Sequence, residues 1–367
     1  MKIFAVGGII RDSLLGLASA DADYVVVGAT PEKMLALGYI PVGQDFPVFL
    51  HPQTRAEYAL ARTERKTGVG YKGFSFQASP EVTLEEDLAR RDLTINAMAR
   101  EIDEHGNMIG PVIDPYGGQA DLRNKIFRHV SAAFVEDPLR ILRVARFASR
   151  FPDFDLAPET LGLLKKMIHE GELAHLVPER VWQEISRGLM SKKPSRMLEV
   201  LQSCAGLKDI FPSDLEQPET FKATCAALEL AGSIHLTLPI RFAALMSCVD
   251  FEQAQAWFDQ LKIPTECRAY AEIFRMWRHH YLNAPMNATN LMTWLDRSDA
   301  WRKPQRLLEL LDLGTTLNLD TTIWRKALIA AQAIDGGQIA KLCQGQSGEM
   351  IGRALDQARL KAVEGVL

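Results

Sequence analysis

Strand patterns occur only in the first part of this chain, and the point where they stop indicates the fold class. The last strand-like stretch ends at Ile113, and the turn residues 114–118 follow it. From Ala120 to Leu367, apolar residues recur at helical spacing and prolines interrupt the pattern. We therefore expect an α+β protein, in which a mixed sheet with helices precedes an all-α region. A chain of 367 residues is too long for one ordinary core, so several domains are expected.

The composition is that of a globular protein, with 47% hydrophobic and 24% charged residues. Apolar runs of membrane-spanning length are missing, and the first residues lack a signal-peptide pattern, so no membrane contact is expected. The cysteines lie scattered in apolar stretches without metal-binding spacing, which predicts reduced core residues in a cytoplasmic protein. Because the net charge is -4, any contact with nucleic acid must be local.

An acidic pair, Asp21 and Asp23, opens the strand-like run 23–27. Residues two apart on a strand face the same way, so the two carboxylates point toward one place and repel each other unless a cation lies between them. Carboxylate oxygens are ligands that suit Mg²⁺. Glu64 is a third candidate carboxylate, and a surface salt bridge explains it equally well. This pair predicts a metal site, although Asp21 alone is also compatible with a capping role in a turn.

A glycine pair precedes the acidic pair in the sequence. The strand-like residues 4–6 run into Gly7 and Gly8, and a helix that carries Arg11 follows. Glycine lets the backbone approach a phosphate closely, and a helix N-terminus favours negative charge. An ordinary turn between strand and helix is the alternative. The glycines and the carboxylates together predict a site for a metal-bound nucleotide.

Two later segments are rich in arginine. In the first, Arg91 and Asp92 precede Asn96 by about one helical turn and offer donors for phosphates and groups for sugar hydroxyls. In the second, arginines recur at helical spacing and no acidic residue follows them one turn later: Arg140, Arg143, Arg146 and Arg150. A solvated charged face is the usual interpretation of such a stripe. Arginine, however, suits bidentate contacts with phosphates or bases.

The motifs, in this order and spacing, closely resemble those of the bacterial class II tRNA nucleotidyltransferases, and most of all those of the CCA-adding enzymes. Five segments carry the resemblance: Gly7 to Asp12, Asp21 to Asp23, Arg90 to Asn96, Asp114 to Gly118 and Glu136 to Arg140. The resemblance is strongest over residues 1–212 and resumes at 300–306. It implies addition of CMP, CMP and AMP to the 3′ end of tRNA, from CTP and ATP, without a nucleic-acid template.

The resemblance also implies an architecture and a set of roles. A nucleotidyltransferase head would span residues 1–118, a helical neck with the nucleotide-selecting helix 119–214, and a helical body and tail for tRNA binding 215–367. Asp21 and Asp23 would be catalytic and would hold Mg²⁺. The triphosphate and ribose would be held by residues suited to these groups: Gly8, Arg11, Arg91, Asp92, Asn96 and Arg143.

Base selection would fall to Asp137 and Arg140. Cytosine and adenine both present an amine donor beside an acceptor nitrogen, and a carboxylate with a guanidinium complements that arrangement. Asp137 before a proline is also an ideal helix cap, which is the alternative. Arg180 and Glu184 resemble a family element that braces this helix, and a surface ion pair explains them equally well.

The chain departs from longer relatives, which carry a His-Asp phosphohydrolase dyad soon after an Arg-Phe-Ala segment. Here Arg241-Phe242-Ala243 is followed by Ala-Leu-Met-Ser-Cys-Val-Asp, so we expect no phosphohydrolase activity. The tryptophans of the helical region are expected in its core: Trp277, Trp294 and Trp301. An A-adding enzyme, a poly(A) polymerase and an inactive RNA-binding protein remain alternatives. The sequence leaves the oligomeric state open, with a monomer as the expectation.

Overall fold

The computed structural model describes residues 1–18, 22–42, 48–66, 74–283 and 285–367. The chain forms two compact units. One, which we call the sheet unit, comprises residues 1–184 and 199–210, and the other, the helical unit, comprises 185–198 and 211–367. The domain boundaries at residues 118 and 214 stay predictions.

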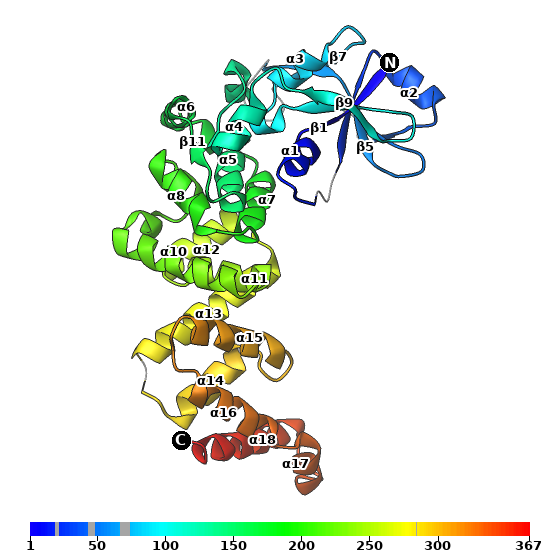
Figure 1. The fold of residues 1–367 in the computed structure, drawn as a ribbon. Coiled ribbons are helices and arrows are strands. Elements are labelled where there is room, and N and C mark those ends of the chain that lie inside the picture. Colours follow the sequence, from blue (N-terminus) through cyan, green and yellow to red (C-terminus); the bar gives the residue numbers. More distant parts are fainter. Residues whose placement is uncertain (19–21, 43–47, 67–73, 284) are drawn as a thin grey trace. The chain divides into compact units, whose positions relative to one another are not determined.

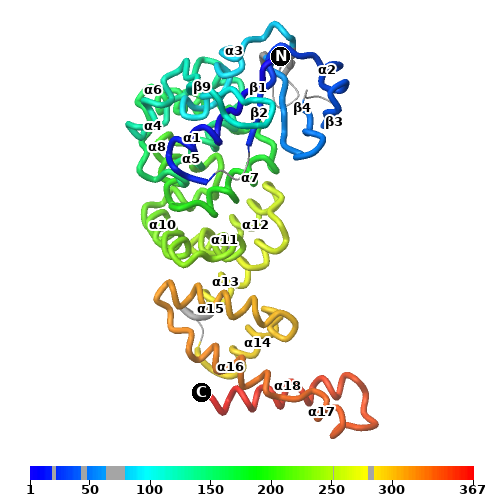
Figure 2. Tube along the Cα trace, turned by 45° about the vertical axis from the view of Figure 1, so that its right-hand side comes forward, coloured from blue at the N-terminus to red at the C-terminus, as the bar shows by residue number. Residues whose placement is uncertain are grey.

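The described residues of the sheet unit form a seven-stranded sheet with the order β3-β4-β5-β2-β1-β8-β9 (Figures 1 and 2). Only the pair β2–β5 is parallel among these neighbours. The strands are β1 (Lys2–Val6), β2 (Asp23–Val27), β3 (Ile40–Val42), β4 (Val48–Leu50), β5 (Glu57–Leu60), β8 (Ala99–Ile102) and β9 (Met108–Ile113). A separate antiparallel pair consists of β6 (Arg62–Lys66) and β7 (Phe74–Ala78).

Both faces of the sheet are apolar, because the strand residues alternate between two clusters. Val25 packs with Phe4 and Leu88 on one face, whereas Val26 packs with Met34 on the other. Polar groups therefore collect where the strands begin and end. In the register of the sheet, Val6 at the end of β1 lies opposite Asp23 at the start of β2.

Helices cover the sheet and continue beyond it. They are α1 (Gly8–Leu14), α2 (Pro31–Ala36), α3 (Leu84–Ala89), α4 (Gly118–Asn124), α5 (Leu139–Arg150), α6 (Pro158–His169), α7 (Pro178–Leu189), α8 (Ser195–Ser203) and α9 (Leu207–Ile210). Short 3₁₀ helices span Thr94–Asn96, Ala132–Glu136 and Glu172–His175. Thr30 caps α2, since its side chain accepts a hydrogen bond from the Lys33 N–H.

The expectation that strands stop before residue 120 is wrong in one detail. A parallel pair of two-residue strands joins β10 (Ile126–Phe127) to β11 (Asp155–Leu156). Lys125 ends α4 in the left-handed conformation, with φ 58°, which turns the chain out of the helix. The buried Phe127 ring then packs on Phe154. Strands of two residues are too short to leave a periodic pattern in the sequence.

The helical unit contains α10 (Pro218–Ser233), a 3₁₀ helix (Ser213–Glu216), α11 (Leu238–Met246), α12 (Phe251–Gln260), α13 (Thr265–Asn283), α14 (Ala288–Arg297), α15 (Pro304–Thr316), α16 (Thr322–Gln332), α17 (Gly336–Leu342) and α18 (Gly348–Glu364). Trp277 and Trp294 are buried in its core, as predicted, and both contact Trp324 edge to face. None of the helices in the described part of the chain could cross a membrane.

The core prediction is wrong for Trp301, which is half-buried. Its indole N–H donates to Asp296 at 2.7 Å, and the Arg359 guanidinium lies 3.9 Å from the ring centroid. Trp301 lies in the turn after α14, where a ring with a polar N–H can remain partly in water.

Candidate active site

A cleft of about 830 Å³ opens in the sheet unit. The ends of β1, β2 and β5 contribute to its walls, together with α1, α5 and the segment after α3. The predicted site residues that the structure describes all line it: Gly8, Arg11, Asp23, Arg91, Asp92, Asn96, Asp137, Arg140 and Arg143. Asp21 lies outside the described residues. Folding thus brings together residues that are far apart in the sequence.

The acidic edge of the cleft includes a carboxylate that sequence reasoning missed. Asp23 begins β2 and is exposed. In the parallel pair β2–β5 its register partner is Glu57, which also lines the cleft. The side chain of Glu64 is outside what the structure describes. Within the described residues no cluster of three or more His, Cys, Asp or Glu could hold a metal ion, so Asp23 and Glu57 would act as ligands only with further groups.

The glycine turn has a conformational requirement at Gly7. Gly7 has φ 73°, which L-residues rarely adopt. A Cβ at this position would also lie 3.0 Å from Nη1 of Arg91. Gly8 then begins α1. The turn therefore allows the Arg91 side chain to approach the backbone at the C-terminal end of β1.

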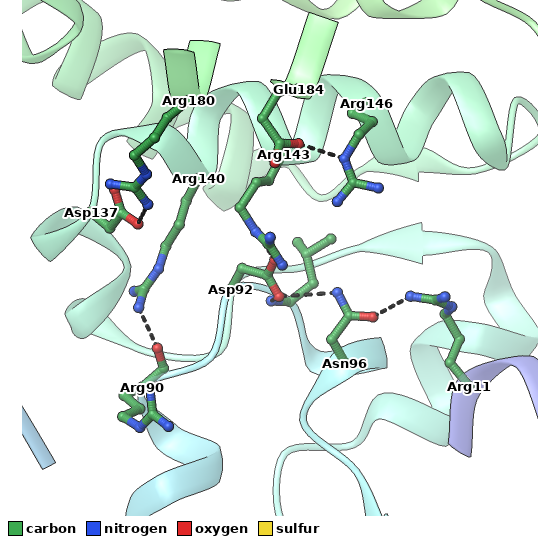
Figure 3. Close-up of polar contacts among 11 residues, drawn as sticks. Arg11, Arg90, Asp92, Asn96, Asp137, Arg140, Arg143, Arg146, Arg180 and Glu184 are labelled. Carbon is green, nitrogen blue, oxygen red and sulfur yellow. Dashed lines mark hydrogen bonds and ion pairs between the residues drawn. The ribbon is translucent and has the colours of Figure 1, made fainter. Parts of the chain in front are cut away.

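A chain of hydrogen bonds links α1 to α5 through the 3₁₀ helix (Figure 3). Arg11 donates from Nη1 to Oδ1 of Asn96 at 2.5 Å, and Asn96 donates from Nδ2 to Asp92 at 3.0 Å. The other Asp92 oxygen accepts from Arg143 Nε at 2.8 Å and Nη2 at 2.7 Å. Burial alone would raise the pKa of Asp92, but Arg143 and Asn96 hold it well below the usual range. Asp92 is therefore ionised at neutral pH.

Asp12 extends this series of hydrogen bonds beyond Arg11 to Arg150. Its Oδ1 accepts from Arg11 at 2.8 to 2.9 Å, and its Oδ2 accepts from Arg150 Nη2 at 2.8 Å. The Arg11 guanidinium also lies within 5.3 Å of the ring centroids of Phe147 and Phe151. Burial lowers the pKa of Arg11, and Asp12 opposes this effect. Arg11 is thus held from several sides.

The predicted base-selecting residues have partners that fix their orientation (Figure 3). Asp137 accepts from Arg180 Nη2 at 2.9 Å and from the Leu139 N–H at 3.1 Å. The second bond is the capping contact that sequence reasoning had as the alternative, so the carboxylate caps α5 while it lines the cleft. Arg140 donates to the carbonyl oxygens of Ala133 and Arg90, each at 2.5 Å.

The arginine stripe of α5 meets partners from other elements. Arg146 donates to Glu184 of α7 at 2.5 Å, while Arg180 of the same helix pairs with Asp137. Both ion pairs connect α7 to α5 or to the residue that caps it, which favours the bracing interpretation. The acidic partners could not be found at i+4 because they come from distant segments of the chain.

Family comparisons agree with this arrangement. Residues 3–128 match the model "Poly A polymerase head domain", and residues 153–214 match "Probable RNA and SrmB- binding site of polymerase A". The "Multifunctional CCA protein" of Burkholderia cenocepacia is 48% identical, over 99% of this chain and 98% of the relative. The chain belongs to the class II CCA-adding tRNA nucleotidyltransferases. The family inferred from the sequence motifs is confirmed.

Solved structures of class II enzymes share the fold. The Thermotoga maritima CCA-adding enzyme complexed with tRNA_CCA aligns with a TM-score of 0.72 and 22% identity, over 99% of this chain and 87% of that one. The Bacillus stearothermophilus CCA-adding enzyme in complex with CTP aligns with a TM-score of 0.69 and 24% identity, over 99% and 89%. The predicted class, a mixed-sheet head followed by an all-helical region, is confirmed.

The motifs located the site of this class II chain but not all of its partners. Glu57 escaped notice because the parallel register of β2 and β5 leaves no local signal in the sequence. Asp12 was visible beside Arg11, yet its pairing with Arg150 joins residues that are 138 positions apart. Such contacts depend on tertiary structure and leave no pattern in a single sequence.

Proposed function

We propose that this chain is a cytoplasmic CCA tRNA nucleotidyltransferase, which adds C, C and A to the 3′ end of tRNA from CTP and ATP and releases pyrophosphate. One observation carries the proposal: a single cleft is lined both by carboxylates, at Asp23 and Glu57, and by several arginines. A nucleoside triphosphate needs both, because its phosphates are anionic and nucleotidyl transfer develops charge on the attacking and leaving oxygens. The relatives that are named "Multifunctional CCA protein" support the same proposal.

The carboxylate edge fits Mg²⁺, since its donors are hard oxygens. We assign Mg²⁺ binding to Asp21 and Asp23, with Glu57 as a third carboxylate. When bound there, Mg²⁺ would stabilise charge on the reacting phosphate oxygens.

We assign the triphosphate to the arginine wall. Arg91, which follows α3, and Arg143 of α5 both line the cleft, and so does Gly8 at the start of α1. Arg11 would contribute from the fixed position that Asp12 and Asn96 give it. Asp92 would help to position the ribose, and its ion pair with Arg143 keeps that arginine in place before the nucleotide binds.

We assign base selection to Asp137 and Arg140. The carboxylate accepts from the exocyclic amine of cytosine or adenine, and the guanidinium donates to the neighbouring ring nitrogen. Uracil and guanine present a carbonyl and an N–H at these places, so each would meet an unsuitable partner. Arg180 supports this role, because its bond to Asp137 fixes the carboxylate in the cleft.

Extension of labelled tRNA transcripts tests the proposal. Transcripts that end before CCA, after the first C and after both Cs are incubated with CTP, ATP or both, in the presence of Mg²⁺. Growth of all three to a CCA end that then stops is the expected result. Extension of the CC-ending transcript alone would identify an A-adding enzyme, long A tails would identify a poly(A) polymerase, and tRNA binding without extension would identify an inactive RNA-binding protein.

The same assay checks base selection through Arg140→Ala. We expect this variant to incorporate UMP or GMP, while transfer of the preferred nucleotide slows less than selectivity falls. The ratio of kcat/KM values for CTP and UTP is the measurement, and a change of about 10-fold or more is expected when one polar discriminating contact is lost. If UTP and GTP stay excluded, the templating role of Arg140 is wrong.

We also assign tRNA binding to the helical unit. A groove of about 620 Å³ there is lined by Arg302 and Lys303, just before α15, and by Arg306 within it. These residues belong to the segment where the resemblance to the family resumes. Basic side chains around a groove suit the phosphate backbone of a duplex, which is recognised largely by shape.

The absence of phosphohydrolase activity stays a proposal. The segment that replaces the His-Asp dyad lies in and after α11, where residues 240–246 are buried. We expect no release of phosphate from p-nitrophenyl phosphate and no hydrolysis of a cyclic nucleotide with Mg²⁺. The relatives named multifunctional make this assay informative.

A further inference from the structure

A completely buried carboxylate, Asp87 of α3, lies behind the arginine wall of the cleft. Its Oδ1 accepts from Arg90 Nη2 at 2.8 Å and Nε at 3.3 Å, and from the Arg62 backbone N–H at 3.4 Å. Its Oδ2 accepts from Arg91 Nη2 at 3.3 Å. Arg62, Arg90 and Arg91 all line the cleft. One carboxylate therefore contacts two segments that contribute cations to the site, at residue 62 and at residues 90–91.

Such a carboxylate is expensive to bury, and its surroundings show how it stays charged. Burial raises the pKa of Asp87, but Arg90 and Arg91 outweigh this effect and lower it below the usual range. The start of α3 is fixed by a capping box between Thr83 and Glu86, one residue before Asp87. The anion is thus held by the helix and does not depend on a bound nucleotide for its place.

Arg91 shows most clearly what Asp87 does. Its side chain is only 19% exposed. One Nη group bonds Asp87, and the other lies where a Cβ on Gly7 would approach within 3.0 Å. The guanidinium is therefore confined between a carboxylate and a residue that must lack a side chain. This arrangement restricts the rotamers of a flexible cation before the triphosphate arrives.

Asp87 also reaches the base-selecting end of the site. The Arg90 side chain is tied to Asp87, and the Arg90 carbonyl oxygen accepts from Arg140 Nη2 at 2.5 Å. A displacement of the Arg90 segment would therefore change the support of Arg140. The same carboxylate is connected to a phosphate-facing arginine and to the arginine assigned to the base.

We propose that Asp87 is a positioning residue for nucleotide binding, which holds Arg91 for the triphosphate and, through Arg90, supports Arg140 for base selection. The inference rests on the proposed function in one respect, namely that Arg91 binds the triphosphate. It goes beyond that function because it assigns a role to a residue that touches neither substrate. A purely structural role for Asp87 is the competing explanation.

Asp87→Asn separates the two explanations because it keeps the shape of the side chain. If the amide oxygen stays toward Arg90 and the Arg62 N–H, the amide nitrogen faces Arg91, donor against donor. Arg91 then loses its anchor. We expect KM for CTP and ATP to rise about 10- to 100-fold, the range for a lost hydrogen bond to a charged group. Glu85→Gln on the exposed face of the same helix is the matched control and should leave KM unchanged.

A double-mutant cycle with Arg91→Ala completes the test. If Asp87 acts through Arg91, Asp87→Asn should add less than about 2-fold to KM in the Arg91→Ala background. A structural role predicts instead that the two effects multiply and that tRNA binding without nucleotide weakens equally. Either of these results would overturn the inference. Circular dichroism melting shows whether each variant is folded at the assay temperature.

The outcomes also separate this inference from the proposed function. If Arg91→Ala leaves KM for both nucleotides unchanged, the triphosphate assignment itself is wrong. If Arg91→Ala raises KM and Asp87→Asn does not, only the role of Asp87 is wrong. Should Asp87→Asn fail to fold, Arg91→Lys is the second variant, because its single ammonium cannot bridge Asp87 and a phosphate as a guanidinium can. A wild-type KM in Arg91→Lys would then overturn the inference.

Discussion

The two units of this enzyme bury different kinds of side chain. In the sheet unit, all but one of the described buried charged residues surround or support the cleft: Arg11, Asp12, Asp87, Asp92, Arg140 and Glu184. The exception, Asp121, pairs with Arg128. In the described part of the helical unit, the buried charged residue is Arg241, which donates to the backbone carbonyls of Leu189 and Leu236. The other buried residues described in this unit are uncharged, and they include stacked and edge-to-face tryptophans.

This difference shows where buried charge is useful. An ion pair in a protein interior stabilises the fold no better than well-packed apolar groups do. Removal of one partner strongly destabilises the protein, because it leaves the other charge buried and unpaired. At a catalytic site, buried charges are useful because they are already oriented when an anionic substrate binds. The helical unit, for which we propose RNA binding at the surface, would need only a rigid interior, and aromatic packing provides it. We therefore expect substitutions in the two units to affect different measurable quantities.

The largest effect is expected at the acidic edge. Asp23→Ala should lower kcat by about 10²- to 10³-fold or more, the range for loss of one group that stabilises the transition state. Its exposure predicts little change in the free energy of unfolding. Single-turnover extension with saturating CTP measures the effect, and Glu104→Ala, in the exposed turn before β9, is the control. Activity within tenfold of wild type would remove Asp23 from the metal site.

The helical unit should show the opposite behaviour. Trp324→Ala removes a buried indole that contacts Trp277 and Trp294. We expect the free energy of unfolding to fall by about 3–5 kcal/mol, as for other large-to-small substitutions in a core. KM for CTP should not change at temperatures where the variant is folded. Urea unfolding and nucleotide KM are the two measurements, and a raised KM for CTP would contradict the division of roles.

How far the sequence predicted this arrangement depends on the kind of signal. Arg91, Asp92 and Asn96 lie within one short motif, so their common location was predictable from local spacing. The partners of Asp12 and Asp137 come from other helices, and the register that brings Glu57 to Asp23 is set by sheet packing. Trp301 was misjudged because hydrophobicity alone does not show that a turn leaves an indole partly exposed.

Asp92 should combine both behaviours, because it is buried and paired while it lines the cleft. We expect Asp92→Asn to reduce the free energy of unfolding by roughly 2–3 kcal/mol at neutral pH, the size typical of a carboxylate with a strongly lowered pKa. Since the folded pKa is the lowered one, this contribution is complete above the unfolded pKa of about 3.9 and is lost as the pH falls through the folded value.

Urea unfolding at several pH values checks the sign of this dependence. The difference between wild type and Asp92→Asn should stay constant from pH 7 to about pH 5 and shrink below about pH 4. Trp324→Ala provides the contrast, because its deficit comes from packing and should persist over the same range. A constant difference for Asp92→Asn down to pH 3 would show that the ion pair with Arg143 does not carry the effect.

The smallest effect is expected at the groove of the helical unit. Arg302 is 80% exposed at its side chain, so Arg302→Ala with Lys303→Ala should leave stability and nucleotide KM unchanged. Binding of tRNA should weaken a few-fold, and its logarithmic dependence on salt should become shallower by about 1 to 2, because each phosphate contact releases roughly one counterion. Filter binding between 50 and 200 mM salt, as in typical counterion-release measurements, gives the slope.

Arg353→Ala is the control for this pair, since Arg353 is an exposed cation of α18 that pairs with Glu349. It should leave the slope unchanged, because Arg353 does not line the groove. An equal change in both variants would mean that tRNA responds to net charge and not to the groove. A shallower slope in the groove variant alone would instead show that a unit with a mainly uncharged core can bind RNA phosphates at its surface, whereas the sheet unit buries charge around its cleft.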